Sequence, residues 1–280
     1  MGFRKKSDIT GYSRLLANER SFDGLFCDSL ELEEKGTLFF NRSFPDDPVF
    51  NHVKVSTRLL TVESIELESF DRLFQLLRNA TKDLSLSTAS IFLEEFWPNA
   101  ARFQRSAIDN GFRVHEQMKT LSKKLGQESR SERIGKGRIH VFETNDVESW
   151  NDIFMRSYLI PNSWGDELLR RERGFLKRNE GTTKLLAASE RESEDASRAK
   201  GCLLLNENPK GIMGVYCVGT LPEARGRGIA RSMLDHSEEI GKHRGCELMT
   251  LQTVVSDNVT PMYFKLGYEL DFERNILQTS

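Results

Sequence analysis

The spacing of apolar positions in the second half of the chain changes from segment to segment, and it predicts the elements there. Two segments carry apolar residues three and four positions apart, as on one face of a helix, and four are short apolar runs typical of strands. The expected strands are 138–144, 183–190, 201–207 and 210–222, and the expected helices are 147–159 and 163–178, with Ser163 as a candidate cap of the second helix. The strands at 183–190 and 201–207 predict a hairpin around a charged loop.

The pattern continues to the end of the chain. A helix is expected from about Ile229 to Lys242, closed near Gly245, and a strand follows at 247–255. A short helix is expected at 260–266 and a last strand at 268–277. The order β, α, α, β, β, β, α, β, α, β predicts a mixed sheet flanked by helices.

A polar, charged stretch divides the chain before these elements begin. SKKLGQESRSERIGKGR, from Ser122 to Arg138, predicts an interdomain linker. We therefore expect an accessory domain at 1–121, a linker at 122–137 and a second domain at 138–280. In the first domain we expect a strand at 88–95, a helix at 99–111 and a further strand or helix at 112–121.

Composition describes an ordinary globular protein. The chain has 280 residues, a net charge of −2 and 38% hydrophobic residues, without the basic excess of a nucleic-acid binder. No segment is long and apolar enough to cross a membrane. The four cysteines, Cys27, Cys202, Cys217 and Cys246, are scattered, which suggests neither a zinc site nor a disulfide framework. We expect free thiols in a cytoplasmic protein and a small or locally recognised partner, with no nucleic acid and no membrane.

One turn in the sequence suits an anion. VGTLPEARGRGIA, from Val218 to Ala230, runs an extended segment into two glycines just before a helix. The first N–H groups of a helix lack intrahelical partners, and the helix dipole adds partial positive charge. Gly226 and Gly228 remove the Cβ atoms that would hinder a phosphate, and Arg225 and Arg227 are candidates for charge-assisted bonds to it. The glycine spacing fits neither a Rossmann turn nor a Walker loop.

The same stretch resembles the signature of the GNAT superfamily of acetyl-CoA-dependent N-acetyltransferases. The family pattern [RQ]-x-x-G-x-[GA] is met from Arg225 to Ala230, and SDNVTPMYFKLGYE at 256–269 resembles a second family motif, with Pro261 in place of the usual alanine. The resemblance covers about 138–280. It implies an α/β (α+β) fold with a mixed, mostly antiparallel twisted sheet, and acetyl-CoA as co-substrate.

The resemblance also implies roles for single residues. The implied cofactor-binding residues are Val218, Thr220, Arg225, Gly226, Arg227, Gly228, Ile229, Ala230 and Asn258. The amides of Val218 and Thr220 would bind the pantetheine arm and stabilise the oxyanion. Tyr263 matches the tyrosine that protonates the departing CoA thiolate. A core position for Tyr263 and a helix cap at Asn258 are the structural alternatives.

Two questions stay open at the sequence level. The family often places an acidic base on the strand before the turn, yet GIMGVYCVGTLP holds no Asp, Glu or His, so His140, Glu143 and Asp257 are the remaining candidates. The first half resembles the closing part of another GNAT domain only faintly, and it has no glycine turn; a degenerate repeat and an unrelated accessory domain both fit. The function is therefore either acetyl transfer to an amine of a small molecule or peptide, or acyl-CoA binding without catalysis. An oligomer is possible in either case.

Overall fold

The computed structural model describes residues 9–62, 66–126, 139–190 and 194–279. The chain forms two compact units. Unit 1 comprises the described residues of Met1–Leu25, Ser122–Leu251 and Met262–Glu269, and unit 2 those of Phe26–Leu121, Gln252–Pro261 and Leu270–Ser280. No helix in the described part of the chain is both long enough and apolar enough to cross a membrane.

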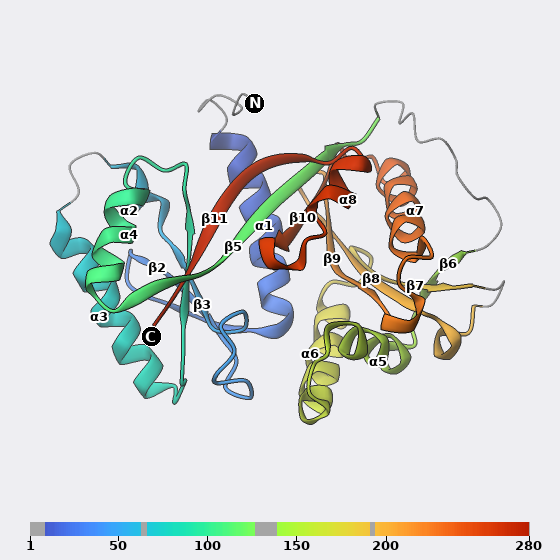
Figure 1. The fold of residues 1–280 in the computed structure, drawn as a ribbon, viewed down its shortest axis with the longest axis horizontal. Coiled ribbons are helices and arrows are strands. Elements are labelled where there is room, and N and C mark those ends of the chain that lie inside the picture. The colour runs from blue at the N-terminus through green and yellow to red at the C-terminus, as the bar shows by residue number, and fades with distance from the viewer. Residues whose placement is uncertain (1–8, 63–65, 127–138, 191–193, 280) are drawn as a thin grey trace. The chain divides into compact units, whose positions relative to one another are not determined.

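Unit 1 is built on a mixed sheet in the strand order β10-β9-β8-β7-β6 (Figure 1). The strands are β6 (His140–Thr144), β7 (Thr183–Ser189), β8 (Gly201–Asn208), β9 (Ile212–Thr220) and β10 (Leu248–Val254). Strands β6 to β9 pair with their neighbours in antiparallel fashion, whereas β10 is parallel to β9. A parallel neighbour needs a crossover, which the helix between β9 and β10 supplies.

Helices cover both faces of this sheet (Figure 1). Opposed pairs of β8 and β9 show which helix lies on which face, because successive residues of a strand point to opposite sides. A Cβ at Gly201 would lie 2.5 Å from Cγ2 of Ile229, whereas a Cβ at Gly219 would lie 2.9 Å from Oγ of Ser157. Since Gly219 is opposite Cys202, the neighbour of Gly201, the two helices lie on opposite faces. They are α7 (Ile229–His243) and α5 (Val147–Tyr158).

Three more helices complete unit 1. They are α1 (Ile9–Phe26), whose last residue is grouped with unit 2, α6 (Gly165–Arg178) and the short α8 (Thr260–Lys265), whose first two residues are grouped with unit 2. The indole N–H of the fully buried Trp150 anchors α5 to the sheet by donating to the carbonyls of Leu186 and Leu203, at 3.1 and 3.3 Å. Helix α1 contributes the buried Asn18, which accepts from the Tyr216 hydroxyl and donates to the Asn206 carbonyl.

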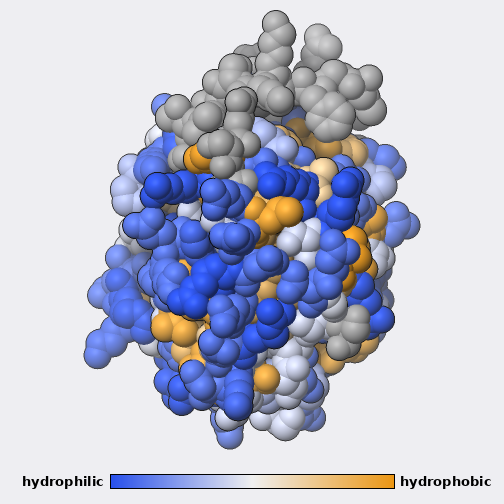
Figure 2. All heavy atoms as spheres, turned by 90° about the vertical axis from the view of Figure 1, so that its left-hand side faces the viewer, coloured by the Kyte–Doolittle hydropathy of each residue, from blue (hydrophilic) through white to orange (hydrophobic). Residues whose placement is uncertain are grey.

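The strands of unit 2 lie in the order β1-β2-β3-β4-β11-β5. Its strands are β1 (Asp28–Glu31), β2 (Gly36–Phe40), β3 (His52–Val55), β4 (Ser90–Glu94), β5 (Phe112–Lys124) and β11 (Glu269–Thr279), and its helices are α2 (Thr57–Thr61), α3 (Leu67–Asp83) and α4 (Ala100–Asp109). Phenylalanine rings of α3, α4 and β5 form a core: Phe70, Phe74, Phe103 and Phe112. The face shown in Figure 2 is mostly hydrophilic, with scattered hydrophobic residues.

The two units share a succession of elements. In unit 2 the parallel pair β3 and β4 is joined by helices and followed by α4 and β5. In the second half of the chain the parallel pair β9 and β10 is joined by α7 and followed by α8 and β11. The strand β3 passes through Ser56 directly into α2, without a glycine turn.

Strand β11 carries a buried ion pair in unit 2. Arg274 lies directly opposite Glu94 of β4, and the two side chains form an ion pair at 3.2 Å. Only 1% of the Arg274 side chain is exposed, and its guanidinium also lies over the rings of Phe92 and Phe272. The pair holds the register of these two strands, because a shifted register would leave both charges buried without partners.

The predicted element order agrees with the structure, and the mixed, mostly antiparallel sheet flanked by helices is confirmed. Residues 112–121 form a strand rather than a helix. Two local predictions are wrong. Ser163 does not cap α6, because a 3-10 turn at Asn162–Trp164 precedes it and Trp164 occupies the cap position. Ser122, placed in the linker, is a buried residue of β5, whereas 127–137 lie outside the described residues.

The compact units also divide the chain differently from the expected domains. The described residues up to Leu25 group with unit 1, although they were expected in the accessory domain. Conversely, 252–261 and 270–280 group with unit 2.

Candidate active site

Strand β9 is irregular where it approaches the glycine turn. The pairing with β8 shifts between Cys202 and Leu204, so that Cys217 and Val218 together stand opposite Leu203. Cys217 adopts a left-handed backbone with φ of +53°. This is a β-bulge, which bends a strand and redirects its backbone groups.

Beyond the bulge, one edge of β9 pairs with β8 and the other faces away from it. The Leu221 N–H donates to the carbonyl of Lys200 at 2.9 Å, on the β8 side. Because backbone groups alternate along a strand, the N–H and C=O groups of Val218 and Thr220 point to the other side. The pairing between β9 and β10 spans Ile212–Gly214, and β9 then continues to Thr220.

The last turn of α5 holds this edge. The Tyr158 hydroxyl donates to the Val218 carbonyl at 3.0 Å, and the Arg225 guanidinium bridges the carbonyls of Thr220 and Ser157, at 3.3 and 2.8 Å. Leu159, which ends the helix in a left-handed conformation, is 80% exposed. The two carbonyls of β9 are thus bonded by side chains, while their N–H groups lie on the same edge.

The glycine turn has the backbone that the sequence predicts. Gly226 and Gly228 have φ of +77° and +88°, and Gly228 is the N-cap of α7. A Cβ at either position would have no heavy atom within 4 Å, so the space beside the turn is open. Among the described residues, no group accepts a hydrogen bond from the N–H groups of Gly226, Arg227, Gly228, Ile229 and Ala230. The turn therefore presents a row of donors and the positive end of a helix dipole to one open space.

The side chains of the two arginines of the turn are already bound by other groups of the protein. Arg225 is bound to the carbonyls described above, and Arg227 forms an ion pair with Glu190 at 2.8 Å and donates to the Glu223 carbonyl at 2.9 Å. Ile229 is buried and packs against Gly201, where a side chain would not fit. Both arginines thus fix the shape of the turn, and the donors left for an anion are the backbone N–H groups.

The second motif supplies two buried tyrosines to unit 1. The rings of Tyr263 and Tyr268 meet edge to face, with centroids 5.8 Å apart. Burial, with the neighbouring Tyr263, Glu238 and Asp235 adding to it, raises the pKa of Tyr268 well above its usual value, so its hydroxyl stays protonated. Asn258 is exposed, has a left-handed backbone with φ of +53° and groups with unit 2. It ends a 3-10 turn and does not directly precede α8.

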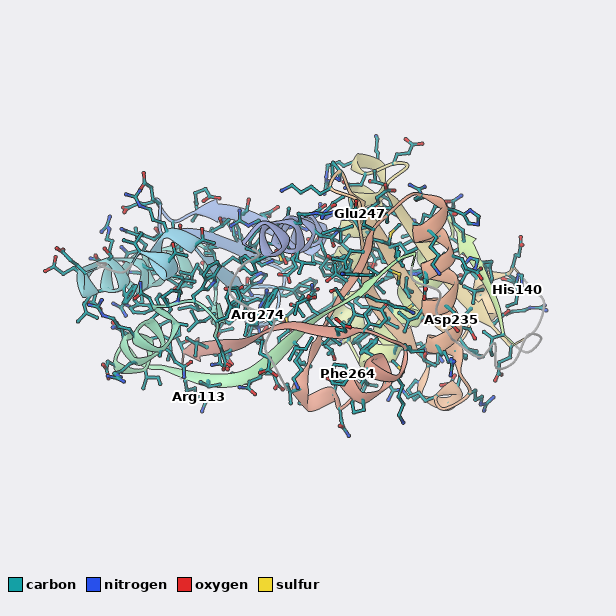
Figure 3. The ribbon with its side chains drawn as sticks, turned by 90° about the horizontal axis from the view of Figure 1, so that it is seen from above. Arg113, His140, Asp235, Glu247, Phe264 and Arg274 are labelled. Atoms are coloured by element: carbon teal, nitrogen blue, oxygen red, sulfur yellow. The ribbon has the colours of Figure 1, made fainter. Side chains whose placement is uncertain are left out.

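Two of the three bases considered from sequence are not placed beside the bulge. His140 and Glu143 lie on β6, three strands from β9, which at about 4.8 Å per strand is roughly 14 Å away. Glu143 pairs with Lys184, and His140 lies 3.9 Å from Glu194 at the edge of the sheet (Figure 3). Asp257 groups with unit 2.

The structure instead reveals an acidic residue that the sequence reasoning missed. Glu172 occupies the buried stripe of α6 between Leu168 and Phe175, and it is 1% exposed. Neither carboxyl oxygen has a hydrogen-bond partner among the described residues, and burial raises the pKa of Glu172 to about 9. The sequence did hold a signal for its burial: Glu172 follows Leu168 by four positions and precedes Phe175 by three, which puts all three on one face of a helix, but it lies within a run of charged residues.

Comparisons with known proteins agree with this geometry. Residues 147–268 match the model of the acetyltransferase (GNAT) family. No curated protein matches the sequence. A GCN5-related N-acetyltransferase from Sphaerobacter thermophilus superimposes with a TM-score of 0.67 at 17% identity, covering 96% of this chain and 91% of that one. One from Kribbella flavida has a TM-score of 0.65 at 14% identity and covers 95% of both chains.

A tandem protein shares the fold as well. The tandem GNAT protein from the clavulanic acid biosynthesis pathway has a TM-score of 0.60 at 12% identity, covering 88% of this chain and 78% of that one. At these identities the likeness concerns the fold alone. Residues 147–268 thus match the GNAT acetyltransferase family, and the fold of the chain is similar to that of a protein described as a tandem GNAT protein.

Proposed function

We propose that the protein is an N-acetyltransferase that moves the acetyl group of acetyl-CoA to an amine of a small molecule or peptide. The observation that carries the proposal is the glycine turn at the start of α7, where Gly226 and Gly228 open the space and successive N–H groups have no acceptor among the described residues. A diphosphate matches this arrangement in charge and size. The match of residues 147–268 to a family of acetyltransferases supports the same assignment.

The outward edge of β9 suits the pantetheine arm of the cofactor. Its amides would pair with the backbone of Val218 and Thr220 as a further strand does. The carbonyl of Val218 is bonded by Tyr158, so a pantetheine amide would replace that hydroxyl or bind beside it. The N–H groups after the bulge are preorganised donors for the oxyanion that forms on the thioester carbonyl.

The chemistry suited to this site is direct attack by the amine on the thioester. The thiols of Cys202 and Cys217 are poor nucleophiles, because burial raises the pKa of both well above the usual value and keeps them protonated. The amine nitrogen forms a bond to the acetyl carbon, the bond from carbon to sulfur breaks, and the sulfur takes up a proton. We assign that proton to Tyr263, whose place in the motif and buried position in unit 1 support the role.

Binding of CoA to Gly228→Glu tests the proposal. The substitution puts a carboxylate beside the helix start, and calorimetry should show at least a tenfold loss of affinity for CoA and for acetyl-CoA. Gly245→Glu is the matched control: Gly245 also has a positive φ, +72°, and open space, but lies beyond the other end of α7, roughly 22 Å away for a helix of 15 residues. Unchanged affinity in Gly228→Glu would contradict the site.

A second measurement separates an enzyme from a binding module. Wild-type protein is mixed with acetyl-CoA and a panel of amines, and free CoA is measured with a thiol reagent. Amine-dependent release of CoA supports the transferase. Tight binding of acetyl-CoA without release for any amine would instead identify a protein that binds acyl-CoA without catalysis.

A further inference from the structure

The bulge of β9 is a strained feature within a regular pair of strands. Cys217 has a left-handed backbone, with φ of +53°, although it carries a side chain. Such a conformation is unfavourable for a residue other than glycine, and it persists only where the surrounding structure enforces it. The contacts on either side of the bulge therefore show what holds it in place.

The pairing of β9 with β8 shows what the bulge changes. Tyr216 lies opposite Leu204 on one side of the bulge, and Gly219 lies opposite Cys202 on the other. Leu204 and Cys202 are two positions apart on β8, so they point to the same face of the sheet, and directly opposed residues share that face. Tyr216 and Gly219 therefore point to one face, although they are three positions apart. In a regular strand they would point to opposite faces, so the extra residue of the bulge brings them together.

On that face, two different helices contact β9, one on each side of the bulge. After the bulge, Gly219 lies against α5, where a Cβ would come within 2.9 Å of the Ser157 Oγ. Before the bulge, the ring of Tyr216 stacks on that of Phe22 in α1, with centroids 3.8 Å apart and planes 4° apart, and the Tyr216 hydroxyl donates to Oδ1 of Asn18. Because both helices lie on the same face, the strand between them needs the extra residue.

The position of α1 on the sheet is fixed by buried polar contacts. Nδ2 of Asn18 donates to the Asn206 carbonyl at 3.1 Å, and Nδ2 of Asn206 donates to the Ser21 hydroxyl at 3.1 Å. Gly214 makes room for this arrangement, because a Cβ there would overlap Oδ1 of Asn18 and would lie 2.5 Å from Cε2 of Tyr216. A shift of α1 along β9 would leave these buried groups without partners, which is costly.

The bulge also decides where the N–H of Val218 points. With the bulge, Val218 is displaced from β8, and its N–H lies on the outward edge of β9, where it is a proposed donor to the oxyanion. In regular pairing from Tyr216 onward, Val218 would lie opposite Cys202, in the place of Gly219. Its N–H would then point towards β8, because backbone groups alternate along a strand. Whatever holds Tyr216 in place therefore also keeps the oxyanion donor directed outward.

We propose that α1 is a positioning element of the acetyl-transfer site: Asn18 and Phe22 hold Tyr216, and thereby the bulge that directs the Val218 N–H to the thioester carbonyl. The inference rests on the proposed acetyl transfer. Asn18 and Phe22 act through Tyr216, so they are positioning residues. Helix α1 lies outside residues 147–268, which match the family model, and Asn18 precedes Tyr216 by 198 positions.

The variants Asn18→Ala and Phe22→Ala of the full chain test the inference. Infrared difference spectra are recorded at saturating acetyl-CoA that carries ¹³C at the thioester carbonyl. In the wild type the carbonyl stretch should move to lower wavenumber on binding, because a preorganised donor polarises the bond, and in both variants this shift should fall by about half or more. With an amine found in the panel, kcat should fall by about 10-fold to 10²-fold, whereas the Kd for CoA should stay within about twofold, because the donors of the glycine turn are kept.

Tyr216→Phe keeps the ring on Phe22 and removes only the hydroxyl, so it decides the question if the alanine variants do not fold. Its carbonyl shift and kcat should fall as well, by a smaller factor. Arg20→Ala is the matched control, because Arg20 is exposed on the same helix and should keep wild-type values. A role limited to stability would lower the melting temperature of the variants but would leave the carbonyl shift and kcat of the folded protein unchanged.

Three outcomes overturn the inference. They are a wild-type carbonyl shift and kcat in Tyr216→Phe or in folded Asn18→Ala, a Kd for CoA that rises as much as kcat falls, and a wild type whose bound thioester shows no shift. The second outcome would mean that α1 supports unit 1 as a whole. In each case the wild type still binds acetyl-CoA and transfers its acetyl group, so the proposed function stands. A wild type that transfers to no amine removes the proposed function, and this inference with it.

Discussion

Replacing Glu172 by glutamine should make the protein more stable at neutral and alkaline pH. The carboxyl has a pKa of about 9 in the folded protein, against an ordinary value of 4.5, because burial disfavours its charged form. Between these two values the folded protein holds a proton that the unfolded chain has released. The stability contributed by the neutral carboxyl is therefore fully present below pH 4.5 and is lost as the pH rises to 9.

The size of the effect follows from one proton. Each pH unit in that window changes the free energy of unfolding by 2.303RT, about 1.4 kcal/mol at 25 °C. Between pH 5 and pH 8 the wild type should thus lose about 4 kcal/mol relative to Glu172→Gln, which has no group to titrate there. This is a large share of the 5 to 15 kcal/mol that typically separates folded and unfolded states.

Urea unfolding at 25 °C, followed by circular dichroism at pH 5, 6, 7 and 8, measures the difference. The two proteins should have similar midpoints at pH 5 and clearly separated midpoints at pH 8. Glu167→Gln is the control: hydrogen bonds from Arg170 and Arg171 lower the pKa of Glu167, so its contribution changes only below pH 4.5. A difference between wild type and Glu172→Gln that stays constant within 1 kcal/mol from pH 5 to pH 8 would refute the reasoning.

Three further substitutions test other parts of the structure. Tyr263→Phe should lower kcat by about 10²-fold to 10⁴-fold with little change in CoA affinity, whereas Tyr268→Phe, which removes the neighbouring hydroxyl, should not; equal rates in all three proteins would make Tyr263 a core residue. Gly219→Ala should destabilise the folded protein by about 1 to 3 kcal/mol in thermal unfolding, because its Cβ would lie 2.8 Å from the Cys202 sulfur; an unchanged melting temperature would show that the backbone at the bulge shifts to make room for the methyl group. Arg274→Met should cost about 3 to 5 kcal/mol in urea unfolding, because it leaves Glu94 buried and uncompensated, and Arg274→Met with Glu94→Leu should recover most of that loss.

The elements of the second half could be predicted because their signals are local. The helix at 229–243 and the glycine turn before it are encoded by residues next to one another in sequence, and both appear where expected. The boundary between units could not be predicted in this way. The grouping of the described residues up to Leu25 with those of 122–251, and the pairing of β11 with β4, join segments that are far apart in the sequence, and composition carries no signal for such pairing.

The parts of the site that sequence reasoning missed depend on packing between elements. The bulge arises because Cys217 and Val218 together face Leu203, and no residue of β9 marks it: Cys217 adopts a left-handed backbone without being a glycine. Glu172 lies in a run of alternating charges, where only the placement of α6 shows which carboxyl points inward. Both features appear once the sheet and its helices are assembled.

The two arginines of the turn match the motif, but their side chains bind other groups of the protein. Their positive charge suggests phosphate ligands, yet Arg225 holds Thr220 and Ser157 together and Arg227 is bound to Glu190 and Glu223. The side chains therefore fix where β9 ends and where α7 begins, at the point where Gly228 needs a left-handed backbone. With the turn held in this way, the N–H groups converge on one space before any ligand arrives, so little ordering has to accompany binding. An anion there would be bound chiefly by the main chain, and the conformation that β9, α5 and the arginines impose on the turn provides its specificity.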